Sequence, residues 1–170
     1  MAIRERASVR HFNSSKDIPD QTIFDIIELG NRAPSAGNLQ ARDFIIVRDI
    51  VKRQGLAKAA YNQNFIIEAP VSIVVCANPD RSSTRYGDRG EDLYTIQDSA
   101  AAIQNMLLVI HSYGLGACWV GAFNEGQASQ TLNLPGNIRP VAIIPIGYPT
   151  QRPEPSSRIN IEKLVHYDQW

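Results

Sequence analysis

The sequence contains little cysteine, no excess of charge and no apolar run long enough to cross a membrane. Its two cysteines, Cys76 and Cys118, are too few for a disulfide framework. Both lie in apolar runs, which favours buried free thiols and fits a reducing compartment. The apolar run at 141–147 is far shorter than the ~20 residues that span a bilayer, and residues 1–12 lack the apolar core of a signal peptide. We therefore expect a soluble, cytoplasmic protein with no membrane partner.

Charge and motif content make several further classes of protein improbable. Lys and Arg total 17, as do Asp and Glu, so the net charge gives no reason to expect nucleic acid as a partner. Neither GxGxxG nor GxxxxGK(S/T) occurs, and Ser35 lies in no GxSxG elbow. His11, His111 and His166 show no metal-ligand spacing. We expect no metal and nominate no catalytic side chain.

Helical and strand patterns are interspersed along the chain. Apolar residues at spacings of three and four predict a long helix over 92–113, in which Asp98 is expected to be exposed or to act as a cap. The apolar run at 71–77 predicts a buried strand. Residues 78–90 are polar, with proline and glycine, and predict an exposed and mobile loop. Further helices are expected at 50–60, 126–132 and 161–166, and further strands at 44–47, 117–120 and 141–146.

The first helix has recognisable ends. Asp20 is its expected N-cap, and Gly30 with Asn31 suits its C-terminal end. Few strand pairs have hairpin spacing, so the pattern predicts a central sheet covered by helices, in the α/β or α+β class. The length predicts a single domain over residues 1–170.

Arg6, Ser8 and Arg10 form the first candidate binding motif. In an extended segment alternate side chains point the same way, so two guanidiniums and one hydroxyl converge on one side. A guanidinium binds phosphate oxygens through paired, charge-assisted hydrogen bonds. The spacing is that of a phosphate site, and a solvated basic tail is the alternative.

Asn38 and Gln40 form the second candidate motif. They follow Gly37 in a stretch of small residues that lets a ligand approach closely. Each amide offers both a donor and an acceptor, which suits the edge of a flat heterocycle. A simple turn between a helix and a strand is the alternative.

The glycine-rich run at 114–123 forms the third motif. Backbone N–H groups of Gly121 and Ala122 could donate to a ligand, whereas Trp119 and Phe123 also suit core packing. Both interpretations can hold, since the wall of a pocket is also part of the core.

In this order and spacing, the three motifs resemble those of the nitroreductase family of FMN-dependent oxidoreductases, over nearly the whole chain. The matching segments are Arg6-Ala-Ser-Val-Arg10-His-Phe12 (RxSxRxF), Ala33-Pro-Ser35, Asn38-Leu-Gln40 (NxQ), Gly114-Leu-Gly116, Trp119-Val-Gly-Ala-Phe123 and Ile144-Pro-Ile-Gly-Tyr-Pro149. Each piece is common by itself, and the joint order carries the resemblance.

The resemblance implies an α+β fold with a central mixed, mostly antiparallel sheet flanked by helices. It also implies an intertwined homodimer with one FMN in each of two clefts at the interface. The first motif would hold the phosphate and ribityl chain, the second the isoalloxazine edge, and the third the reactive N5 side. The cofactor-binding residues are then Arg6, Ala7, Ser8, Arg10, Asn38, Gln40, Gly121, Ala122 and Arg158, the last returning to the phosphate.

The activity implied is a ping-pong cycle of hydride transfer. NAD(P)H would reduce the flavin, and an electron-poor acceptor such as a nitroaromatic or a quinone would then be reduced. Dehalogenase or dehydrogenase chemistry on the same scaffold and a non-catalytic flavin-binding module are the alternatives. The chain departs from the family pattern at Ala7, at Ala41-Arg42 and at Ser156, which lowers the positive charge expected near the flavin.

Overall fold

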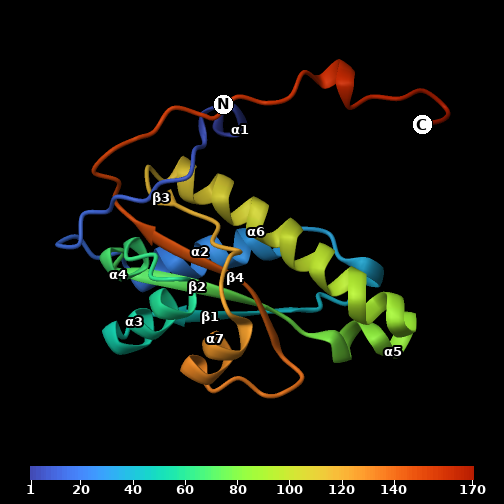
Figure 1. Ribbon diagram of the computed structural model, residues 1–170, viewed down its shortest axis with the longest axis horizontal. Coiled ribbons are helices and arrows are strands. Elements are labelled where there is room, and N and C mark those ends of the chain that lie inside the picture. The colour runs from blue at the N-terminus through green and yellow to red at the C-terminus, as the bar shows by residue number, and fades with distance from the viewer.

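The computed structural model describes residues 1–170 and contains one four-stranded sheet (Figure 1). The strands are β1 (Arg42–Val47), β2 (Val71–Ala77), β3 (Gly116–Ala117) and β4 (Arg139–Gly147), in the order β1-β2-β4-β3. All neighbours are antiparallel. The α+β class is confirmed, but the sheet within this chain is not mixed. β1 and β2 are joined at one end of the sheet, where Val47 pairs with Ser72. The connection from β2 to β3 crosses to the other end, because β2 finishes opposite Arg139 of β4 whereas β3 begins opposite Gly147.

Helices cover both faces of the sheet (Figure 1). The longer helices are α2 (Asp20–Asn31), α3 (Ile50–Ala59), α5 (Pro79–Arg89), α6 (Thr95–Ser112) and α7 (Glu125–Leu132). The shorter ones are α1 (Ala2–Glu5), α4 (Phe65–Glu68), the 3-10 turns η1 (Ala36–Asn38) and η3 (Ile161–Lys163), and the π turn η2 (Gly90–Tyr94). α2 and α6 pack on one face, and α3, α4 and α7 on the other. No helix combines the length and the apolar character needed to span a membrane.

Strand β2 lies at the centre of the core, and all of its residues are buried. Its side chains alternate between the two faces: Ile73 and Val75 pack beside α2 and α6, whereas Val74 and Cys76 pack beside α3 and α7. The predicted buried strand is confirmed. Cys118 is buried as well, and neither cysteine forms a disulfide, as predicted.

Gly30 allows α2 and α6 to pack closely. A Cβ atom at this position would lie 2.3 Å from Cγ of Met106 and 3.3 Å from the carbonyl oxygen of Ala102. The helix continues to Asn31. The glycine therefore serves packing between helices, in addition to standing near the helix end.

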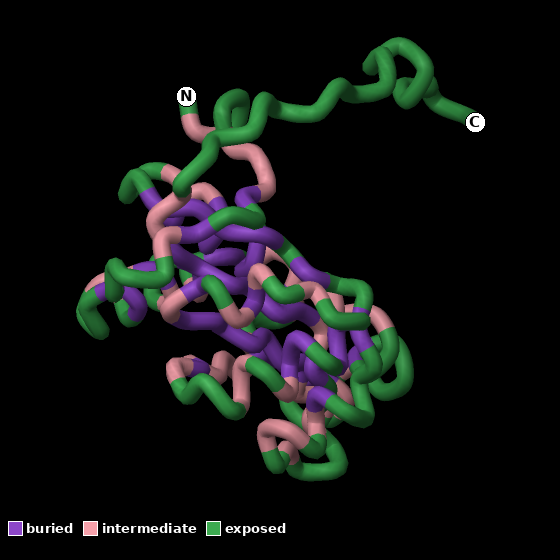
Figure 2. The backbone as a smooth tube through the Cα atoms, turned by 60° about the vertical axis from the view of Figure 1, so that its left-hand side comes forward, coloured by how far each residue is buried: buried purple, intermediate pink, exposed green.

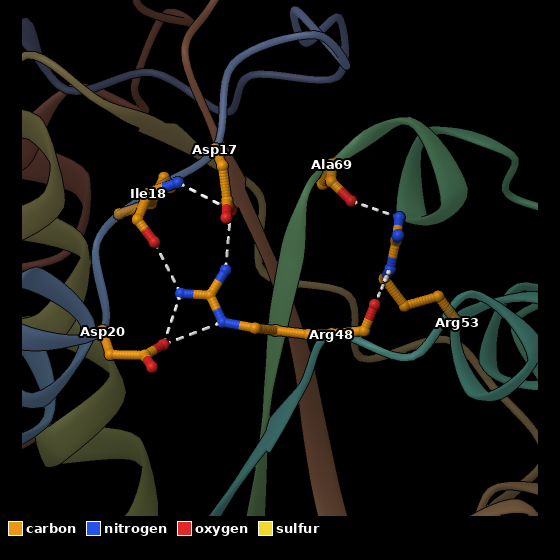
Figure 3. Close-up of polar contacts among 6 residues, drawn as sticks. All are labelled: Asp17, Ile18, Asp20, Arg48, Arg53 and Ala69. Atoms are coloured by element: carbon orange, nitrogen blue, oxygen red, sulfur yellow. Dashed lines mark hydrogen bonds and ion pairs between the residues drawn. The ribbon is translucent and has the colours of Figure 1, made fainter.

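Arg48, which follows β1, ties the start of α2 to the sheet (Figure 3). Its guanidinium donates to Asp17 at 2.7 Å, to Asp20 at 3.0 Å and to the carbonyl oxygen of Ile18 at 2.5 Å. The predicted N-cap role of Asp20 is wrong. Asp20 is the first helical residue, Pro19 occupies the cap position, and the carboxylate binds Arg48 instead of the helix N–H groups.

Residues 79–94 are helical, so the predicted loop at 78–90 is wrong. Pro79 stands in the first turn of α5, where its missing N–H costs nothing. Arg81 then fixes the helix against β1, with Nη2 2.6 Å from Asp43 Oδ1. Gly87, at φ +54°, breaks the helical geometry inside α5. The stabilising contacts come from a distant strand, so local polarity could not reveal them.

Residues 151–170 form a C-terminal arm that is exposed along its whole length (Figure 2). The predicted helix at 161–166 is reduced to the short turn η3. Its apolar side chains pack against nothing in the single chain, and packing is what stabilises most short helices. The large apolar side chains exposed on the arm are Ile159, Ile161, Leu164, Val165, Tyr167 and Trp170.

Candidate functional site

The segment after α1 runs in extended conformation beside β3. The Val9 N–H donates to the Ala117 carbonyl oxygen at 2.9 Å, and the Val9 side chain is buried. Ser8 and Arg10, on either side of Val9, therefore face away from the core. Arg6 ends α1 with extended φ and ψ. The alternation expected of the first motif is present at Ser8 and Arg10, whereas Arg6 lines the same cavity as Ala7 and Val9.

Two cavities lie along this segment. Arg6 and Ala7 line a cavity of about 240 Å³, which also contains Arg152. Ser8 and Arg10 line a second cavity, of about 270 Å³, which again contains Arg152. Glu5 and His111 also line the first cavity, their side chains 3.8 Å apart. Several guanidinium donors at neighbouring cavities make a suitable environment for a phosphate or another oxyanion.

The thiol of Cys118 lies close to the side chains of Arg6, Ser8 and Arg10. Burial raises the pKa of its thiol, and Arg10, Ser8 and Arg6 lie close enough to oppose that rise. The guanidinium of Arg10 lies 5.9 Å from the centre of the Phe65 ring, an arrangement that fixes the cation over an aromatic face. The first motif is therefore a defined cluster and not a solvated tail.

Gly121 and Ala122 follow the same segment toward α7. Val120 pairs with Ile143 of β4, and beyond it the N–H groups of Gly121 and Ala122 donate no hydrogen bond within the chain. Both residues are exposed, and the carbonyl oxygen of Ala122 accepts from Gln63 at 3.4 Å. Their backbone N–H groups are therefore free within the chain, and their role toward a ligand stays a prediction.

Trp119 and Phe123, the two aromatic residues at 119–123, differ in burial. Phe123 is buried in the cluster beside α3 and α7, whereas Trp119 is 38% exposed and its indole approaches Gly121. Phe123 is therefore a core residue, and Trp119 forms part of the surface next to the free N–H groups.

The loop that carries Asn38 and Gln40 is held in a fixed, unusual conformation. Both residues have positive φ, at 59° and 51°, and Gly37 does too, at 57°. The Gln40 N–H donates to Ser35 Oγ at 3.0 Å, and the Gln40 side chain accepts from Asn31 at 3.3 Å. Asn38 is exposed, and its side-chain amide makes no hydrogen bond within the chain. Its amide is thus free to bind a ligand.

Asp98 and Arg42 build this loop from beneath, and sequence reasoning missed both roles. Asp98 is buried, and its carboxylate accepts from the N–H groups of Ala36 at 3.0 Å and Ala41 at 3.4 Å. It binds the loop from the first turn of α6, so the prediction that Asp98 is exposed is wrong. No local sequence signal identifies such a partner 62 positions away.

Helix α5 covers the other side of the same loop. A Cβ atom at Gly37 would lie 2.6 Å from the Tyr86 hydroxyl and 3.0 Å from Nη1 of Arg85. Arg81 also donates to the Gln40 carbonyl oxygen at 3.1 Å. The segment expected to be a mobile loop is therefore a helix packed against the Asn38 loop.

The two groups of candidate residues are apart within one chain. Asn38 and Gln40 line a cavity that shares no residue with the two arginine-lined cavities. Asp98, near the start of α6, holds the loop of Asn38 and Gln40, whereas His111, near the end of α6, lines the Arg6 cavity. The helical rise puts these residues roughly 20 Å apart along α6, and Figure 1 shows η1 and the segment after α1 near opposite ends of the helix.

Arg158 is not brought to either group. It lies in the exposed arm, where Nη1 donates to the carbonyl oxygens of Ser156 at 2.8 Å and Ser157 at 3.1 Å. Within one chain the predicted return of Arg158 to the phosphate site does not occur. Arg152, at the base of the arm, is the arginine that lines both cavities. The only sequence signal for Arg152 was that a basic residue follows the Tyr148-Pro149 turn.

The structure is an α+β domain with guanidinium-lined cavities, which suit an anionic ligand. A family model described as "Nitroreductase family" matches residues 3–65 and 50–148. A relative from Archaeoglobus fulgidus, whose name gives it as a candidate NADH dehydrogenase/NAD(P)H nitroreductase, is 31% identical and aligns over 99% of this chain and 96% of its own length. The chain belongs to the nitroreductase family.

Solved structures agree with this assignment. A candidate NADH dehydrogenase/NAD(P)H nitroreductase from Parabacteroides distasonis superposes with a TM-score of 0.88 at 30% identity, covering 99% of this chain and 96% of that one. NADPH:FMN oxidoreductase from Vibrio harveyi, solved with NAD+, gives 0.90 at 31% identity, covering 99% and 76%. The predicted nitroreductase-like fold is confirmed.

Proposed function

We propose that this chain is an FMN-dependent NAD(P)H oxidoreductase that reduces electron-poor small molecules such as nitroaromatics or quinones. The observation that carries the proposal is the convergence of Arg6, Ser8 and Arg10 at two adjoining cavities, in a chain that belongs to the nitroreductase family. The V. harveyi relative is named as an NADPH-flavin oxidoreductase, which agrees with the same activity. We further propose that residues 1–170 act as one domain.

The donors present fit FMN. Arg6 and Arg10 would bind the phosphate and the polar chain next to it, with the Ser8 hydroxyl and the backbone at Ala7 between them. The free N–H groups of Gly121 and Ala122 would donate to the ring. A bound flavin supplies reversible two-electron transfer. Positive groups close to its ring stabilise the charge that develops there.

Asn38 and Gln40 would bind the ring edge from a second copy of the chain. One chain places them far from the arginine cluster, and an antiparallel pair of chains would bring each Asn38 loop to the other chain's arginines. The apolar, exposed arm provides surface for such a dimer, and Arg158 would then act from the assembled form. We therefore propose an intertwined homodimer with two composite sites.

Purified protein tests this proposal directly. Protein loaded with FMN is expected to absorb near 450 nm, as flavin itself does, and to bleach under anaerobic conditions when NADH or NADPH is added. Colourless protein that cannot be loaded would exclude the cofactor. Protein that binds FMN but bleaches with neither nucleotide would instead be a flavin-binding module without this donor reaction.

A further inference from the structure

Arg152 lies where the two arginine-lined cavities meet. It lines the cavity of Arg6 and the cavity of Ser8 and Arg10. Resting on the proposed function, we propose that Arg152 binds the phosphate group of the flavin mononucleotide. It would complete the anion site from within the same chain.

The backbone holds Arg152 at this position. After β4, the Asn13 N–H donates to the Tyr148 carbonyl oxygen at 2.9 Å, and the Thr150 N–H donates to the His11 carbonyl oxygen at 3.1 Å. These bonds keep the start of the arm beside the segment that contains Arg10. Arg152 therefore belongs to the arginine cluster, although the rest of the arm leaves the body of the protein (Figure 2).

The side chain is oriented but not neutralised. One of its N–H groups donates to the Gly114 carbonyl oxygen at 2.7 Å, at the end of α6. A guanidinium has five N–H donors, so most remain available. No carboxylate lies within ion-pairing distance of it. Glu5, the one carboxylate in the Arg6 cavity, pairs with the chain's N-terminus and lies near His111.

The position of Arg152 also bears on the basic residues that this chain lacks relative to the family pattern. Ala7 and Ser156 stand where basic residues are common in the family, and Arg158 binds carbonyl groups of its own arm. Arg152 restores a positive charge to the same site from a neighbouring position. A purely structural role, tying the arm to the end of α6 through Gly114, is the competing explanation.

Comparison of FMN with riboflavin separates the two explanations, because riboflavin lacks only the phosphate. Flavin fluorescence titration gives the dissociation constant of each for wild type, Arg152→Ala and Arg152→Lys. We expect Arg152→Ala to weaken FMN binding about tenfold or more, from the loss of a charged hydrogen bond, and to change riboflavin binding less than twofold. Arg152→Lys keeps the charge and should recover part of the loss.

Arg139→Ala is the matched control, because Arg139 is also exposed but pairs with Glu125 at 2.8 Å, outside these cavities. It should leave both constants unchanged. The proposal would be overturned if Arg152→Ala weakened the binding of FMN and riboflavin equally, or changed neither. It would also be overturned if only Arg158→Ala weakened FMN binding selectively. Wild-type protein that binds neither flavin would refute the proposed function instead.

Discussion

Arg42 shows how a single buried charge can organise a binding loop. Its side chain is 2% exposed, and its guanidinium donates to Asn31 Oδ1, to the Asn31 and Ala33 carbonyl oxygens, and to the Asp98 carbonyl oxygen, all within 3.0 Å. A further bond reaches the Pro34 carbonyl oxygen at 3.4 Å. Burial lowers the pKa of Arg42, and the charge of Asp98 opposes this. The cost of burying the charge is offset by these acceptors.

We predict that Arg42→Met lowers the free energy of unfolding by about 3 kcal/mol, because it leaves buried carbonyl groups without their donor and removes the positive charge near the buried Asp98 carboxylate. Urea unfolding at pH 7 measures the change. Arg139→Met, which removes an exposed ion pair with Glu125, should cost under about 1 kcal/mol. Similar costs for the two substitutions would show that the Arg42 network contributes little.

The thiol of Cys76 makes the free energy of unfolding depend on pH in the alkaline range. Burial, and then the charge of Asp43, raise its pKa to about 12. Above pH 9 the unfolded thiol ionises while the folded thiol keeps its proton. The unfolded state then binds fewer protons, so stability falls as pH rises.

We therefore predict that wild type loses stability relative to Cys76→Ala by roughly 1.4 kcal/mol per pH unit above pH 9. Urea unfolding of both proteins at pH 8, 9 and 10 gives this difference, with other alkaline titrations cancelling between them. A difference that stays constant over this range would mean that the folded thiol ionises as easily as the unfolded one.

The sequence provides local signals for the candidate binding residues but none for the residues that hold their loops in place. Arg6, Ser8 and Arg10 follow from alternation in an extended segment, and Asn38 from turn chemistry, because these signals are local. Asp98 reaches its loop across 62 positions, so only the folded chain reveals its role.

At the scale of elements, packing between α2 and α6 depends on one missing side chain. Gly30 leaves room for Met106, whose Cγ atom would lie 2.3 Å from a Cβ atom. Because these helices cover one whole face of the sheet, this contact fixes α6 and with it Asp98.

We predict that Gly30→Ala destabilises the protein by about 1–3 kcal/mol, the usual cost of overpacking a core. Gly126→Ala in α7 is the matched control: its Cβ atom would meet only the Asn124 side chain at 3.4 Å. Because alanine favours a helix, this control should be neutral or stabilising by up to about 1 kcal/mol. Thermal unfolding of both variants compares them, and a Gly30→Ala protein as stable as the control would contradict the packing argument.

Element prediction succeeded where the pattern is strong and failed where distant contacts decide. The run at 71–77 is apolar except for Ser72, and its strand was predicted with the observed ends. α5 was missed because Arg81 is anchored on Asp43 of β1, and a polar helix held in this way has no periodic apolar face. At 161–166 the opposite holds: apolar residues recur, but the chain alone offers them no surface.

At the scale of the whole molecule, the proposed site requires two chains. The arginine cluster and the Asn38 loop lie at different cavities, near opposite ends of α6 (Figure 1). In a symmetric dimer the same pair of half-sites occurs twice. Each complete site would then contain Arg6 and Arg10 of one chain and Asn38 of the other.

Mixing two inactive variants tests this arrangement. One carries Arg6→Ala with Arg10→Ala, and the other carries Asn38→Leu. We predict that each alone has little NADH-dependent reductase activity, and that refolding them together in equal amounts restores about a quarter of the wild-type activity. Half of randomly assorted dimers are mixed, and each mixed dimer has one intact site. Each variant refolded with itself is the control. Activity no higher than the sum of the two controls would mean that every site is built within a single chain, and the proposed antiparallel arrangement would then be wrong.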